Sequence, residues 1–141
     1  MSRHDFAKRV AVVTGAARGI GKATAAAFAE AGAAVAGVDI DARAAADTAN
    51  EIGPSALPIA CDVSHSNSVA AMVGTVIAQF GGIDIVVNNA GICERVSVEA
   101  LTEEQWDRTL AVNLKGPFLV SQAALPYLKQ SDRGRIVNIA S

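Results

Sequence analysis

Short apolar runs alternate along the chain with longer segments of helical periodicity. The runs have the length of strands and are rich in valine and isoleucine: Arg9–Thr14, Ala34–Asp39, Leu57–Cys61, Ile83–Val87 and Arg135–Ile139. Between them, apolar residues recur at helical spacing in Ile20–Ala31, Asp41–Ile52, His65–Phe80 and Glu103–Gln130. The pattern predicts five strands, each separated from the next by helix.

The predicted strands are nearly continuous in apolarity, which is typical of strands that are buried on both faces. Because right-handed strand–helix–strand connections place helices on both faces, their repetition gives an α/β fold with a doubly wound parallel sheet. We expect the strand order 3-2-1-4-5 in a single domain over residues 1–141. Thr102 and Gln105 have the spacing of a capping box at the start of the last helix, which Gly116-Pro117 should bend or break.

Composition and charge exclude several classes of protein. The chain has 141 residues, of which 51% are apolar and 18% charged, and its net charge is −2. These values exclude intrinsic disorder and argue against nucleic-acid binding. The sequence has neither a signal-peptide pattern nor an apolar run near the roughly 20 residues that span a membrane. Two cysteines without a CxxC pair, Cys61 and Cys93, and two isolated histidines argue against a metal site and for a cytoplasmic location.

A glycine-rich segment, Thr14–Gly21, follows the first predicted strand and opens the first predicted helix. Glycines there permit a tight turn and a close approach to a pyrophosphate, and the free N–H groups of the helix N-terminus attract phosphate. Asp39 ends the next strand, where a carboxylate accepts hydrogen bonds from ribose hydroxyls but repels a 2′-phosphate. The pattern predicts a dinucleotide site that favours NAD over NADP. Arg18 could reach a 2′-phosphate, or it could be a solvent-exposed loop cation.

Four motifs occur in a familiar order: Gly15-x-x-x-Gly19-x-Gly21, Asn88-Asn89-Ala90-Gly91, Val112-Asn113-Leu114-Lys115-Gly116 and Arg135–Ser141. Together they resemble the short-chain dehydrogenase/reductase family over essentially the whole chain. The resemblance implies a Rossmann-type fold and an NAD-dependent oxidoreductase. Such an enzyme interconverts a secondary alcohol and a ketone by hydride transfer. The alternative is a catalytically inactive nucleotide-binding half, or one fragment of a split enzyme.

The resemblance also implies a role for each matching residue. Asp39 would hold the adenosine ribose, and Asp62 would bind the adenine amino group. Asn113 would kink its helix and hold a water of the proton relay, and Ser141 would bind the substrate oxygen; these two are the predicted catalytic residues. Together with Arg18 of the loop, the predicted cofactor-binding residues are Gly15, Gly19, Ile20, Gly21, Asp39, Asp62, Val63, Asn88, Ala90 and Gly91.

Several of these residues also have a purely structural interpretation. Asp62 and Ser64 could cap the helix that follows them. Asn88 and Asn89 could form a turn without a ligand. Pro117 alone could account for a kink in the last helix. The residues by themselves leave these alternatives open.

The tyrosine and lysine that the family uses as acid/base, in a Tyr-x-x-x-Lys motif, are not among these residues. Tyr127 is the sole tyrosine, and Ser131 rather than lysine stands four residues after it, so we expect Tyr127 to pack. Proton transfer at the substrate oxygen needs such a pair, so the 141 residues alone are expected to be inactive. They are expected to be the N-terminal portion of a longer enzyme.

The last strand and the last helix are expected to lack a covering neighbour. The fifth strand would then be an unpaired edge. An exposed apolar face on Glu103–Gln130 would favour a dimer or tetramer, or contact with a companion C-terminal fragment. The apolar positions expected on this face are Trp106, Leu110, Leu114, Phe118, Leu125 and Leu128.

Overall fold

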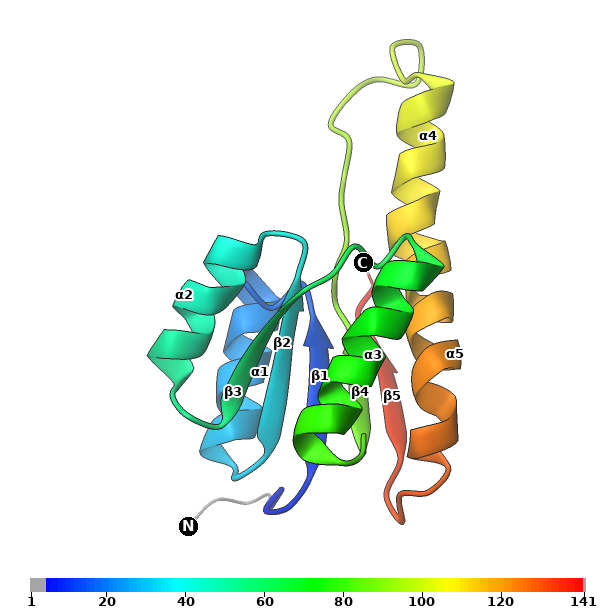
Figure 1. Ribbon diagram of the computed structural model, residues 1–141. Coiled ribbons are helices and arrows are strands. Elements are labelled where there is room, and N and C mark those ends of the chain that lie inside the picture. Colours follow the sequence, from blue (N-terminus) through cyan, green and yellow to red (C-terminus); the bar gives the residue numbers. More distant parts are fainter. Residues whose placement is uncertain (1–4, 141) are drawn as a thin grey trace.

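The computed structural model describes residues 5–140, which form a five-stranded sheet between two layers of helices (Figure 1). Every strand pair is parallel, and the strand order is β3-β2-β1-β4-β5. The predicted doubly wound sheet and its strand order are confirmed. In chain order the elements are β1 (Val10–Thr14), α1 (Gly19–Glu30), β2 (Ala34–Asp39), α2 (Ala42–Ile52), β3 (Ala56–Ala60), α3 (Ser66–Phe80), β4 (Ile85–Asn88), α4 (Glu103–Leu110), the π-helical turn η1 (Ala111–Lys115), α5 (Gly116–Leu128) and β5 (Arg135–Asn138).

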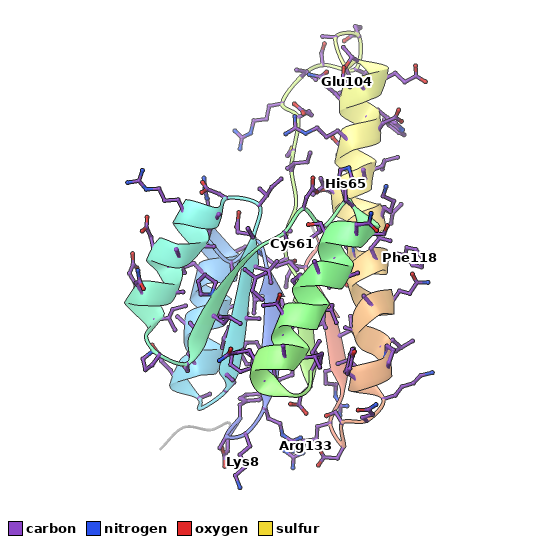
Figure 2. All side chains as sticks on the ribbon, viewed as in Figure 1. Lys8, Cys61, His65, Glu104, Phe118 and Arg133 are labelled. Carbon is purple, nitrogen blue, oxygen red and sulfur yellow. The ribbon has the colours of Figure 1, made fainter. Side chains whose placement is uncertain are left out.

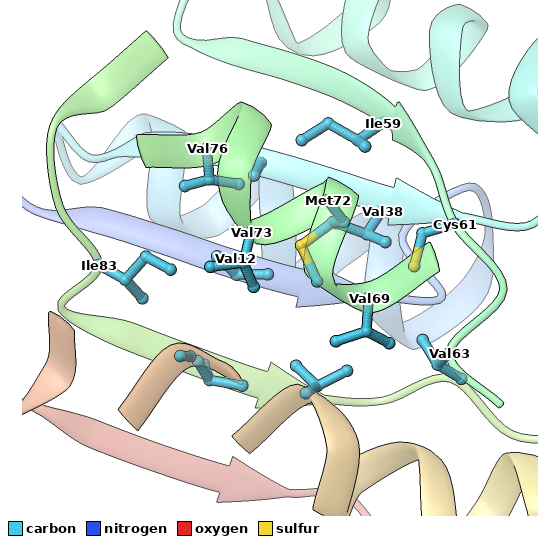
Figure 3. Packing of buried hydrophobic residues seen from close by; sticks show 14 of the residues in the cluster. Val12, Val38, Ile59, Cys61, Val63, Val69, Met72, Val73, Val76 and Ile83 are labelled. Carbon is cyan, nitrogen blue, oxygen red and sulfur yellow. The ribbon is translucent and has the colours of Figure 1, made fainter. Parts of the chain in front are cut away.

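Side chains of β1 alternate between two hydrophobic cores on opposite faces of the sheet. Val10 and Val12 join a core beneath α3 and α5, and Ala11 and Val13 join a core beneath α1 and α2. Figure 3 shows the first core, in which Met72 of α3 lies among valines of the sheet and of its own helix. Burial on both faces explains why the central strands are apolar at nearly every position.

The two outer strands are less buried than the sequence predicted. All four residues of β5 are exposed, and β3 fully buries only Ile59. Each of these strands pairs with a single neighbour, so each lies at an edge of the sheet. The prediction that the fifth strand is an edge is therefore confirmed, whereas burial on both faces holds only for the central strands.

The predicted helix Glu103–Gln130 is divided into α4 and α5 by η1. The capping box at its start is confirmed: Thr102 Oγ1 accepts a hydrogen bond from the Gln105 N–H at 3.1 Å, and Gln105 Oε1 accepts one from the Thr102 N–H at 3.0 Å. The irregular turn begins at Ala111, before the Gly116-Pro117 pair that was expected to cause it. Beyond the carboxyl ends of the strands, α4 and the loop before it project away from the sheet (Figure 1).

Apolar side chains remain exposed on α4, η1 and α5, as predicted, with one exception. Figure 2 shows Phe118 on the side of α5 that faces away from the sheet. The prediction for Leu128 was wrong, because this residue lies in the last turn of α5 and is buried in the core beneath that helix. Tyr127 packs against the same core, as predicted. The exposed side chains are those of Trp106, Leu110, Leu114, Phe118 and Leu125.

At the amino ends of the strands, Asp84 connects three segments of the chain. Its Oδ2 accepts a hydrogen bond from the Val10 N–H at 2.8 Å, and its Oδ1 accepts one from Ser131 Oγ at 2.6 Å. The Arg9 guanidinium also donates to Asp84, at 3.3 Å. One carboxylate thus joins β1, the start of β4 and the turn before β5. Within residues 5–140, no helix has both the length and the apolarity that a membrane span requires.

Replacing Asp84 by alanine is expected to lower the free energy of unfolding by about 1–3 kcal/mol, because the Val10 N–H and the Ser131 hydroxyl lose their acceptor. Circular dichroism would detect this as a lower Tm, by about 3–4 °C for each kcal/mol. Asp132→Ala is the matched control, since Asp132 is an exposed carboxylate that also bonds to Arg9. Equal Tm shifts in the two variants would contradict the role assigned to Asp84.

Candidate functional site

A cleft of about 760 Å³ lies at the carboxyl ends of the central strands, where the loops of parallel strands meet. Among the predicted binding residues, those on its wall are Gly15, Arg18, Asp39, Asp62, Val63, Ala90 and Gly91. Gly19, Ile20, Gly21 and Asn88 lie outside this wall. Residues on the wall that the sequence did not single out as binding residues include Asp41, Cys61, Asn89, Arg108 and Val112.

The loop between β1 and α1 approaches the end of β4 so closely that two positions require glycine. Gly15 has a φ of +64°, and a Cβ there would lie 2.9 Å from Cα of Ala90. A Cβ on Gly21 would lie 2.1 Å from the carbonyl oxygen of Gly15. The absence of both side chains lets α1 begin directly beside the end of β4.

The N-terminus of α1 has open space beside it and no side-chain cap from its N-cap residue. That residue is Arg18, whose guanidinium only donates hydrogen bonds and cannot accept one from the first-turn N–H groups. A Cβ on Gly19 would meet no atom of the described residues within 4 Å, and Ile20 is 65% exposed. Free N–H groups at an open helix N-terminus suit phosphate. The residues present therefore fit the pyrophosphate of a dinucleotide.

Thr14 and Asn89 hold the glycine loop against the end of β4. Thr14 Oγ1 accepts hydrogen bonds from the backbone N–H groups of Asn89 and Ala90, both at 3.0 Å. Asn89 Nδ2 donates to the carbonyl oxygens of Thr14, at 3.1 Å, and Gly15, at 3.2 Å. Neither residue was predicted from the sequence to be part of the site. The signal available in the sequence was the Thr14 hydroxyl at the last position of an otherwise apolar strand.

Asp39 is fixed by backbone hydrogen bonds from two loops. Its Oδ2 accepts from the Ala17 N–H and its Oδ1 from the Asp41 N–H, both at 3.0 Å. Each carboxylate oxygen can accept a further hydrogen bond. Asp39 is therefore positioned at the cleft and retains the capacity to accept hydrogen bonds from hydroxyl groups of a ligand.

Asp62 follows β3 and is bonded within its own turn. Its Oδ1 accepts from the Ser64 N–H at 3.0 Å and from Ser64 Oγ at 2.6 Å, and its Oδ2 lies 3.1 Å from His65 Nδ1. The hydrogen bond from the Ser64 hydroxyl, more than any other contact, lowers the pKa of Asp62 below its ordinary value of 3.8. Asp62 is thus a carboxylate at neutral pH. The N-cap of α3 is His65, not Asp62 or Ser64.

Cys61 lies beside Asp62, at the point where β3 ends and the cleft begins (Figures 2 and 3). Burial is the main reason that the pKa of the Cys61 thiol is raised. The group is therefore a neutral thiol at physiological pH and not an activated nucleophile. In the described part of the chain, no three His, Cys, Asp or Glu side chains come together as a metal site would require.

Asn113 lies in η1 and pairs with the loop that follows β4. Its Nδ2 donates to the Ile92 carbonyl oxygen and its Oδ1 accepts from the Ile92 N–H, both at 2.8 Å. The side-chain amide thus bonds to both backbone groups of one residue and joins the loop to the helix. Single π-helical turns recur at functional sites. Val112, the residue before it, lies on the cleft wall.

The structure directs Asn88 away from the cleft. Its side chain is buried, and Nδ2 donates to Ser121 Oγ at 3.1 Å and to Asn138 Oδ1 at 2.9 Å. Asn88 therefore connects β4 with α5 and β5 instead of lining the cleft. Ser141, which was predicted to be catalytic together with Asn113, lies outside the described residues.

Comparisons with known proteins agree with this geometry. A family model described as short chain dehydrogenase matches residues 9–141. D-threitol dehydrogenase from Mycolicibacterium smegmatis is 45% identical over 136 residues, which are 94% of this chain and 52% of that protein. Galactitol 2-dehydrogenase from Agrobacterium fabrum is 42% identical over 134 residues, which are 94% of this chain and 52% of that protein. The chain spans about half the length of the curated relatives it matches.

A solved structure has the same fold. The crystal structure of 3-ketoacyl-(acyl-carrier-protein) reductase from Brucella melitensis, complexed with NADH, superposes with a TM-score of 0.94 at 37% sequence identity. The match covers 97% of this chain and 59% of that chain. The two chains therefore share the arrangement of strands and helices that forms the cleft.

The variant Ser64→Ala is expected to raise the pKa of Asp62 toward its ordinary value of 3.8, because the hydroxyl no longer donates to the carboxylate. Carbon-13 NMR of the side-chain carboxyl during a pH titration measures this. Because the folded pKa is lowered, the linked stability is present above the unfolded pKa and is lost as the pH falls through the folded pKa. The folded protein therefore loses this stability below about pH 4, and the variant should lose less of it.

Ser66→Ala provides the control for this titration. Ser66 is an exposed serine of the same segment, at the first position of α3. Its replacement should leave the pKa of Asp62 unchanged. If both variants had the wild-type titration curve, the hydrogen bond from Ser64 would not be the main cause of the shift.

Proposed function

Since the chain belongs to the short-chain dehydrogenase family, we propose that it forms the NAD-binding part of an oxidoreductase that interconverts a secondary alcohol and a ketone. The observation that carries the proposal is the placement of Asp39. Two backbone N–H groups fix this carboxylate on the cleft wall. The N-cap residue of α1, whose N-terminus is open, lies on the same wall. Ribose hydroxyls and phosphate are the groups that this pair of features suits.

Different residues around the cleft bind different parts of the proposed cofactor. Gly15, Gly19 and Ile20 bind the phosphates through the loop and the first turn of α1. Asp39 accepts hydrogen bonds from the adenosine ribose and disfavours the 2′-phosphate of NADP through charge repulsion. Asp62, which is ionised at neutral pH, accepts from the adenine amino group. Apart from Arg18, which lies on the cleft wall, the remaining predicted residues shape the walls or the packing behind them: Gly21, Val63, Asn88, Ala90 and Gly91.

Asn113 and Ser141 are the proposed catalytic residues of this part of the enzyme. The bound nicotinamide exchanges a hydride with the substrate carbon, and the protein has to orient the substrate oxygen and move its proton. Asn113 supports the loop after β4 by bonding to Ile92, which sets the cleft wall on that side. Tyr127 cannot serve as the acid/base here, because it packs against the core beneath α5.

The exposed apolar face of α4, η1 and α5 is the proposed contact with further protein. Trp106, Leu114 and Phe118 are each more than half exposed on it. Exposed apolar area of this kind on neighbouring turns marks interaction surfaces. We assign it to a homodimer or tetramer, with a companion C-terminal fragment as the alternative occupant. Both cysteines are free thiols, in keeping with the proposed cytoplasmic location.

NADH is expected to bind the 141-residue chain, and Asp39→Asn should weaken this binding by about tenfold or more, because a charged acceptor is lost. The fluorescence of bound NADH measures both dissociation constants, and circular dichroism verifies the fold. Asp47→Asn is the matched control: it removes the same charge from an exposed position on α2, away from the cleft. Equal NADH affinities for the Asp39 and Asp47 variants would overturn the assignment of the ribose site.

Turnover is expected to require residues beyond these 141. With NADH and a panel of small ketones, the chain alone should bind the cofactor, and the absorbance at 340 nm should fall only at the uncatalysed rate, since these residues contain no Tyr-x-x-x-Lys pair to move the proton. Adding a segment that carries a Tyr-x-x-x-Lys motif should restore oxidation of NADH if the chain is one part of a split enzyme. Ketone reduction by the chain alone would show that another group here moves the proton.

A further inference from the structure

We propose that Asp41 is a second determinant of cofactor selectivity, because it occupies the Arg18 guanidinium in an ion pair and so withholds it from a 2′-phosphate. The inference deepens the proposed function and rests on it, since it presumes that adenosine ribose lies beside Asp39. In the proposed function, the charge of Asp39 repels a 2′-phosphate directly. The structure adds a second contribution, which acts through the cation of the glycine loop.

Arg18 is the cation of the glycine loop, and it lies on the same cleft wall as Asp39 and Asp41. Its side chain is 74% exposed, and its Nη2 lies 3.2 Å from Asp41 Oδ2. A guanidinium is the side chain best suited to bind a phosphate dianion, because its N–H groups form a planar fork. An arginine at this position would favour NADP if it were free to do so.

Two hydrogen bonds fix Asp41 in a position where it can pair with Arg18. Its Oδ1 accepts from the Ala44 N–H at 3.0 Å and caps α2, and its own N–H donates to Asp39 Oδ1, also at 3.0 Å. One carboxylate oxygen thus serves the helix and the other serves Arg18. Exposed ion pairs are usually weak, partly because two flexible side chains must be ordered. Here the carboxylate is already fixed, so mainly Arg18 loses freedom.

The variant Asp41→Asn separates the two functions of this side chain. Asparagine is as good an N-cap as aspartate, so α2 keeps its cap. The amide is uncharged, so the ion pair with Arg18 is lost and the guanidinium becomes available. Asp41→Ser, which also preserves an N-cap, is the second variant and guards against an effect peculiar to the asparagine side chain.

Dissociation constants for NADPH and NADH, measured by fluorescence of the bound cofactor, test the proposal. Asp41→Asn should tighten NADPH binding about threefold to tenfold and leave NADH binding within about twofold. In an Arg18→Gln background the same substitution should change NADPH binding by less than about twofold. The gain should also shrink in 0.5 M salt, because exposed charges are screened. Asp47→Asn, with the same charge change on α2, should affect neither cofactor.

Two outcomes would overturn the inference. If the Asp41 variants gained no affinity for NADPH, Arg18 would not be withheld by Asp41. If the gain were equally large in the Arg18→Gln background, Asp41 would act through its own charge, or Arg108 on the same wall would be the cation involved. Failure of the proposed function is distinct from both: NADH would then not bind the unmodified chain, or Asp39→Asn would not weaken it.

Discussion

The close approach of the glycine loop to the end of β4 is the contact on which the site depends. A Cβ on Gly15 would collide with the backbone of Ala90, and a Cβ on Gly21 would collide with the Gly15 carbonyl group and the Asn89 side chain. Because neither has a side chain, the Thr14 hydroxyl can accept two N–H groups of the loop after β4. The same approach brings the open N-terminus of α1 to the cleft. The proposed phosphate site thus follows from packing that is required for the fold itself.

Backbone hydrogen bonds then carry this order from one loop to the next. Ala17 of the glycine loop donates to Asp39, and Asp39 also accepts from the backbone of Asp41. On the other side, Asn113 bonds to both backbone groups of Ile92. Asp39 and Asn113 are thus each bonded to the main chain of a loop other than their own segment.

Much of the fold could be predicted from the sequence, because valine-rich runs between helices specify a parallel sheet. Coverage by neighbours could be predicted in part: the edge position of β5 and most of the exposed face of α4, η1 and α5 are confirmed. Leu128 is the exception, because it is buried although it was assigned to that exposed face. Asn88 shows a signal that was present but unused. Strand alternation places it on the same face as Val86, beneath α5, where it bonds to Ser121. The motif identifies Asn88 as a polar residue of interest, and only the strand alternation indicates to which face of the sheet its side chain points.

A site that relies on backbone groups, as proposed here, tolerates divergence of the sequence. The superposition with a TM-score of 0.94 comes at only 37% sequence identity. N–H groups at a helix terminus are present whatever side chains follow, so a phosphate site of this kind needs only a few fixed residues, mainly glycines. Selectivity among cofactors is different, because it depends on charge. In the proposed assignment it is divided among Asp39, Asp41 and Arg18, three exposed or partly exposed groups that can change singly without disturbing the core. A fold with this division can keep its binding of the pyrophosphate while its preference for the 2′-position shifts.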